Sequence, residues 1–171
     1  MRNGPGKPPR RPARRLGIAL FVVGAALPAI AGAPRAAAFQ FRAGDWVTEC
    51  RTPADCSITG LFQQTNMDGR RGSFALVIMV QSGQLAVVGQ PFPVRARLQI
   101  DRNNPAECVG TRYCIFSRRE ARRAIDELST GSLVLVDVYT VRNVFRSSLS
   151  TIGYQDSLAK LRAEGYAVPA S

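Results

Sequence analysis

The feature that most constrains the fold is a set of four cysteines in two close pairs, Cys50 with Cys56 and Cys108 with Cys114. Four cysteines allow three pairings, and the residues alone do not choose among them. Turn-prone residues lie between the members of each pair, so we favour two local disulfides over long-range pairing. Each such bridge would stabilise the fold by about 2–3 kcal/mol, because it restricts the unfolded chain.

The N-terminal segment predicts a cleavable signal peptide over residues 1–38. Six basic and no acidic residues lie among the first fifteen, an apolar run from Leu16 to Ile30 follows, and three alanines end at Ala38. We expect cleavage after Ala38 and a periplasmic or secreted product, with general secretion favoured over the twin-arginine route. A retained anchor is the alternative, but the run is shorter than the roughly 20 residues of a spanning helix and a glycine and a proline interrupt it. No lipobox cysteine follows the segment, so a lipid anchor is not predicted.

The net charge of +11 comes largely from this segment. Seven of the 23 basic residues and none of the 12 acidic ones precede Phe39, which leaves 16 basic against 12 acidic residues, or +4, in residues 39–171. Positive charge in a signal peptide serves export, so the composition does not indicate nucleic-acid binding. The remaining 133 residues fit a single disulfide-stapled β domain.

Strand patterns dominate residues 39–171. Val94 to Ile100 alternates apolar and polar residues, which is typical of a strand with one buried face. Short runs rich in valine and isoleucine, bounded by glycine, proline or serine, predict buried strands. These further strands are expected at residues 41–49, 74–80, 85–88, 133–141 and 144–152. The pattern predicts an all-β fold, which we expect to be a jelly-roll-like β-sandwich with two short helices.

Two segments have helical signals instead. Ser117 is followed three residues later by Glu120, which is a capping box, and apolar residues then recur at helical spacing as far as Gly131. Near the C terminus, Tyr154 and Leu158 start a second helical repeat, and a glycine follows it.

Few residues are suited to catalysis or metal binding. The chain contains no histidine, which removes serine–histidine and cysteine–histidine nucleophiles and the commonest general base. Zinc is disfavoured because structural sites usually place paired ligands about two to four residues apart, a shorter spacing than either cysteine pair has. Asp137 interrupts an apolar strand and is interpreted as an edge or ion-paired residue, and Trp46 as part of the core. We therefore predict no catalytic residue, no cofactor, no metal and no enzymatic activity.

Short motifs follow one another in a fixed order along almost the whole of residues 39–171. They are Trp46-Val47-Thr48-Glu49-Cys50, then Cys56 with Gln63, then Pro91-Phe92-Pro93 before Leu98-Gln99-Ile100-Asp101, then Cys108 and Cys114 with Gly131 after the helix, and finally Ser148-Leu149-Ser150-Thr151-Ile152-Gly153-Tyr154 with Leu158 and Leu161.

In this order of motifs the chain resembles the invasion-associated locus B family of exported bacterial proteins. It departs from the family pattern at Tyr113, where the family has a glycine before the last cysteine, and the second cysteine loop is a residue longer. The resemblance implies an all-β periplasmic or envelope-associated protein without established catalytic residues. Some pathogenic relatives are linked to host-cell invasion, a role that the resemblance does not transfer to this chain.

Three classes of function remain. We favour a non-catalytic envelope protein that binds a protein or glycan partner, with no nucleic acid and no transmembrane anchor after signal cleavage. The alternative is an anion-binding module in which Arg118, Arg119, Arg122 and Arg123 bind an acidic or phosphate-rich polymer, unless they form an ordinary solvated helix face. An enzyme built on carboxylates or a reactive thiol is the third and least favoured class.

Overall fold

Alternating and apolar segments fold into strands over most of the chain. The structure is a computed structural model, and it describes residues 39–66, 68–166 and 168, so the predicted signal peptide lies outside the described residues. The described part contains, in chain order, β1 Phe39–Ala43, β2 Trp46–Thr52, β3 Asp55–Thr65, β4 Arg71–Met79, β5 Gln84–Gln90, β6 Arg95–Ile100, β7 Ala106–Val109, β8 Cys114–Ile115, α1 Arg118–Thr130, β9 Leu133–Tyr139, β10 Val144–Ser150 and α2 Ile152–Ala163.

The strands form two antiparallel sheets. The larger sheet has the order β1-β2-β3-β4-β5-β8, and the smaller one has the order β10-β9-β6-β7. This arrangement confirms the all-β, sandwich-like fold with two short helices. The jelly-roll detail is wrong, because β1 to β5 follow one another as a meander instead of the two Greek keys of a jelly roll.

Large side chains join the inner faces of the two sheets. The rings of Phe74 on β4 and Phe145 on β10 lie with their centroids 5.0 Å apart. Trp46 on β2 is 1% exposed, and its indole N–H donates to the carbonyl oxygen of Ser150 at 2.7 Å. Trp46 is therefore a core residue, as predicted, and it also connects β2 to the end of β10.

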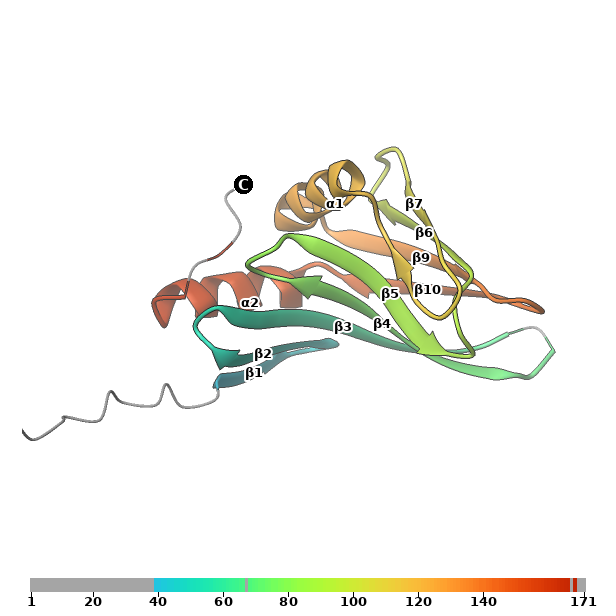
Figure 1. The fold of residues 1–171 in the computed structure, drawn as a ribbon, viewed down its shortest axis with the longest axis horizontal. Coiled ribbons are helices and arrows are strands. Elements are labelled where there is room, and N and C mark those ends of the chain that lie inside the picture. Colours follow the sequence, from blue (N-terminus) through green and yellow to red (C-terminus); the bar gives the residue numbers. More distant parts are fainter. Residues whose placement is uncertain (1–38, 67, 167, 169–171) are drawn as a thin grey trace, which may run out of the picture. The chain divides into compact units, whose positions relative to one another are not determined.

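The two helices lie at one end of the sheets, and the β3–β4 and β9–β10 hairpins lie at the other end (Figure 1). Helix α1 contacts β5, β6 and β7, whereas α2 contacts β1, β2 and β3. The apolar residues that predicted the helices are buried in both: Ala121, Ala124, Ile125 and Leu128 in α1, and Tyr154, Leu158 and Leu161 in α2. Both helix predictions are confirmed.

One strand prediction is wrong, and three strands were not predicted. The strand expected over residues 41–49 is a hairpin of β1 and β2, because Gly44 adopts a φ of +58° and turns the chain there. Strand β3 was not predicted, because Gly60 and the polar residues of its C-terminal half interrupt the alternation of apolar and polar residues. The space beside Gly60 is tight, since a Cβ on it would approach the Trp46 ring to 3.1 Å. The short strands β7 and β8 were also not predicted.

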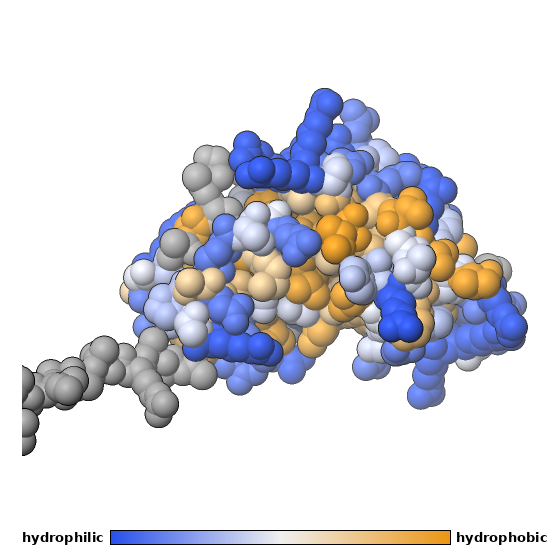
Figure 2. Space-filling view, viewed as in Figure 1, coloured by the Kyte–Doolittle hydropathy of each residue, from blue (hydrophilic) through white to orange (hydrophobic). Residues whose placement is uncertain are grey.

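The outer face of the larger sheet is partly apolar. Val77 pairs with Ala86 and Ala86 with Ile115, while Ala75 pairs with Val88, so these side chains share one face of β4, β5 and β8. Figure 2 shows apolar residues across the middle of the visible face, with hydrophilic residues around them.

Candidate binding site

The arginines predicted to bind anions lie on the exposed side of α1. Arg118, Arg119, Arg122 and Arg123 are all exposed. Arg123 is occupied within the chain, because it forms an ion pair with Glu127 at 3.6 Å and donates to the Asn104 carbonyl at 3.1 Å. The other three take part in none of the ion pairs found among the described residues.

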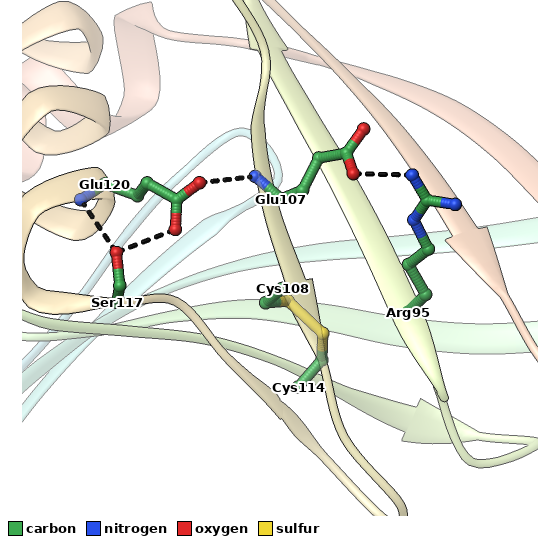
Figure 3. Close-up of a disulfide and its surroundings, with 6 residues drawn as sticks. All are labelled: Arg95, Glu107, Cys108, Cys114, Ser117 and Glu120. Carbon is green, nitrogen blue, oxygen red and sulfur yellow. Dashed lines mark hydrogen bonds and ion pairs between the residues drawn. A yellow bond between two sulfur atoms is a disulfide. The ribbon is translucent and has the colours of Figure 1, made fainter.

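A chain of polar contacts fixes the start of α1 beside the second disulfide (Figure 3). The Ser117 hydroxyl accepts from the Glu120 N–H at 3.3 Å and donates to the Glu120 carboxylate at 2.7 Å, which is the predicted capping box. Glu120 also accepts from the backbone N–H of Glu107 at 3.3 Å, and the Glu107 carboxylate pairs with Arg95. The serine contact is the main reason why the pKa of Glu120 is lowered. Each of these groups has a partner within the chain, which indicates a structural role.

The two disulfides are Cys50–Cys56 and Cys108–Cys114, so the preference for local pairing is confirmed. No cysteine thiol is left among the described residues, and no group of acidic or cysteine side chains there is arranged to hold a metal ion. Asp137 lies on β9, an inner strand of its sheet, and forms an ion pair with Arg146 at 3.2 Å. It is therefore an ion-paired residue, one of the two roles expected for it, and not an edge residue.

A pocket of about 440 Å³ opens at the hairpin end of the domain, away from the helices. Its volume is within the range of small-molecule and side-chain binding pockets. Most of the wall is apolar, and two of its apolar side chains are unusually exposed: Phe92 at 48% and Val141 at 84%. The lining residues are Arg70, Arg71, Pro91, Phe92, Val94, Thr111, Thr140, Val141, Arg142, Asn143 and Phe145.

Hydrogen bonds hold the two hairpins of this pocket together. The Asn66 side-chain amide donates to Asn143 Oδ1 at 2.8 Å, which joins the β3–β4 turn to the β9–β10 turn. Asn66 Oδ1 in turn accepts from the backbone N–H of Arg70 at 2.8 Å. Further along, Gln64 donates to the Ser147 hydroxyl at 3.1 Å. These hydrogen bonds restrain the two hairpins relative to each other, which lowers the entropy cost of binding.

The rim of the pocket is positively charged. Arg70, Arg71 and Arg142 are exposed, and none of them belongs to an ion pair among the described residues. Among the residues that the structure describes, no aspartate or glutamate lines the pocket. An apolar wall next to three unpaired guanidinium groups suits a ligand that joins an apolar group to a negative charge.

A second hollow, of about 470 Å³, lies between β3 and β10 and is more polar. Its wall offers mainly amides and hydroxyls, from Gln63, Gln64, Ser73, Ser147 and Ser148. The aromatic residue in the wall, Phe62, is only 6% exposed, so the hollow has no open ring on which a sugar could stack. The charged, apolar pocket is therefore the stronger candidate.

Sequence reasoning missed the pocket, and none of the four α1 arginines lines it. Its residues come from four connections between strands and from the starts of β4 and β10, and only the sheet pairing brings these segments together. The sequence does carry two weak signals. An apolar residue precedes an arginine between two strand patterns in Val141-Arg142, and a phenylalanine lies between two prolines in Pro91-Phe92-Pro93.

Comparison with known proteins found no matching family model, no matching curated protein and no matching solved structure. Among the described residues, neither helix has the length and apolar character needed to cross a membrane.

Proposed function

We propose that the chain is an exported, non-catalytic binding protein that recognises a partner through the pocket rimmed by Arg70, Arg71 and Arg142. The observation that carries the proposal is the combination of exposed apolar side chains with arginines that form no ion pair among the described residues, on two hairpins joined by a hydrogen bond. Such groups suit binding, because an arginine stays protonated at every physiological pH and is a poor proton carrier.

Export and the family resemblance belong to the same proposal. Both cysteine pairs form disulfides, and disulfides persist in oxidising compartments such as the periplasm. We retain membership of the invasion-associated locus B family as a proposal, which rests on the ordered motifs of the sequence and agrees with the β-rich fold and the two local bridges.

The test is pocket-dependent capture from intact envelopes. The full chain, with a C-terminal tag, is cross-linked in an exporting bacterial host, and captured molecules are identified after pull-down. Val141→Asp places a negative charge at the pocket mouth, on a residue so exposed that stability should change little. A binding hot spot contributes about 2 kcal/mol or more, so we expect capture by this variant to fall roughly tenfold or more.

The matched control is Ile152→Asp, the same kind of substitution on α2 at a residue that is 63% exposed and does not line the pocket. It should capture the partner as well as the original chain does. Equal capture by all three proteins would refute the pocket as the binding site.

The α1 arginines support a second candidate function. Because Arg118, Arg119 and Arg122 are exposed and without ion pairs among the described residues, they offer forked donors to an anionic polymer. Retention on heparin that falls with salt and is lost on Arg119→Glu with Arg122→Glu would support it. Equal retention of the variant would leave these residues a solvated helix face.

A further inference from the structure

The positive charge of the pocket comes from two separate hairpins. Arg70 and Arg71 belong to the β3–β4 connection and the start of β4, whereas Arg142 belongs to the β9–β10 turn. The apolar side chains of Phe92 and Val141 are exposed in the same pocket. A fitting ligand therefore needs an apolar group in the pocket and negative charges that can reach more than one point of the rim.

We propose that the pocket binds an acidic segment of a partner protein, with one large apolar side chain in the pocket and carboxylates on either side of it. This inference rests on the function proposed above and names its ligand. An extended peptide carries side chains at regular intervals, so it can place an anchor and its flanking charges at the same time. A single-tailed carboxylate carries one negative charge, whereas the rim carries three guanidinium groups that form no ion pair among the described residues.

Each contact has a physical basis in the described side chains. Arginine presents a planar fork of N–H donors that matches a carboxylate. An aromatic anchor can pack edge-to-face against Phe92, which is 48% exposed, and arginine can also stack on its ring. The acidic residue nearest in sequence to Arg70 and Arg71 is Asp68 in the β3–β4 turn. Asp68 accepts a hydrogen bond from the Asn66 amide at 3.4 Å and does not line the pocket, so the carboxylates that bind the rim must come from the ligand.

The experiment measures peptide binding by fluorescence anisotropy. The probe is a fluorescein-labelled octapeptide with one tryptophan flanked by aspartates, and the protein is the exported full chain. We expect saturable binding that weakens with added salt and is lost when the aspartates are replaced by asparagines or the tryptophan by serine.

Matched variants locate the site. Charge reversal in Arg142→Glu should weaken binding by about threefold to tenfold, since an exposed charge pair contributes up to about 1 kcal/mol and reversal adds repulsion. Arg51→Glu is the control, because Arg51 is exposed at the opposite end of the β2–β3–β4 ladder and does not line the pocket. It should bind within about twofold of the original chain.

The outcomes separate this inference from the proposed function. If no peptide binds at concentrations up to about 1 mM while Val141→Asp still abolishes capture from envelopes, the ligand class is wrong and the binding function stands. If sodium decanoate binds with the same dependence on Arg142 and the peptide does not, the pocket takes a single-tailed amphiphile and the inference is overturned. If neither the peptide nor envelope capture depends on the pocket, both proposals fail.

Discussion

Removing the disulfides one at a time separates their effect on the unfolded chain from their effect on the folded domain. The two variants are Cys50→Ala with Cys56→Ala, and Cys108→Ala with Cys114→Ala. Both bridges have a sequence separation of 6, and all four sulfur-bearing residues are at most 4% exposed. Loop closure therefore gives both bridges the same effect on the unfolded chain, a stabilisation of about 2–3 kcal/mol at 25 °C.

The folded surroundings of the two bridges differ. Cys50 and Cys56 are direct partners in the β2–β3 ladder, so backbone hydrogen bonds hold this geometry without the covalent bond. Cys108 and Cys114 join β7 of the smaller sheet to β8 of the larger one, and the loop between them carries the pocket residue Thr111. We expect the variant without the Cys108–Cys114 bridge to gain mobility in this loop and to bind the acidic peptide more weakly. Its free energy of unfolding should fall by no more than that of the other variant.

The assay is urea unfolding at 25 °C, followed by the fluorescence of the single tryptophan, Trp46, with hydrogen exchange measured on each variant. The free energy of unfolding of the variant without the Cys50–Cys56 bridge should fall by about 2–3 kcal/mol, and its peptide binding should stay unchanged. A loss below about 1 kcal/mol in that variant would refute the unfolded-state argument. Unchanged hydrogen exchange over residues 109–115 in the second variant would refute the argument from the folded surroundings.

Three further predictions concern the packing and charge of α1 and α2. Gly153→Ala should lower the free energy of unfolding by about 1–3 kcal/mol despite a better helix propensity, because its Cβ would collide with the Ala43 carbonyl; a higher Tm would contradict this. Burial raises the pKa of Tyr154 from 10.0 to about 12, so the unfolded chain loses its proton first and stability should fall between pH 10 and 12, by up to about 3 kcal/mol. Tyr154→Phe should remove this loss, and parallel urea curves for both proteins at pH 9 and about 11 check it. Ser117→Ala should cost about 1 kcal/mol and raise the pKa of Glu120 toward its ordinary value, which an NMR titration would detect; an unchanged titration would show that the hydroxyl is not the cause.

Local signals in the sequence predicted the elements that depend on local interactions. The capping box at Ser117 and the alternation from Val94 to Ile100 need no knowledge of the rest of the fold, and both were correct. The predictions failed where a contact between residues far apart in sequence determines the local structure. Gly60 is typical of a turn, yet it lies within β3, where a Cβ would come within 3.1 Å of the Trp46 ring and of Leu149.

The binding pocket could not be predicted for a related reason. Its arginines and apolar residues belong to separate connections, and the Asn66–Asn143 hydrogen bond that joins two of these spans 77 residues of sequence. The α1 arginines were easier to find, because their i, i+4 spacing is a local pattern. Clustering of charge along the sequence therefore locates the α1 arginines but does not show that Arg142 lies in the same pocket as Arg70 and Arg71.

The charges of the pocket have no counter-charge that would give them a structural role. Arg95, Arg123, Arg146 and Lys160 each have an acidic partner, whereas the pocket arginines, like Arg118, Arg119 and Arg122, form no ion pair among the described residues. Like charges near one another without counter-charges weaken a fold slightly, so they contribute no stability that would explain their position. A residue kept for stability should lower the Tm when it is changed. The Arg142→Glu variant should instead bind the acidic peptide more weakly while its Tm stays the same or rises, and a lower Tm together with unchanged binding would identify Arg142 as a structural residue.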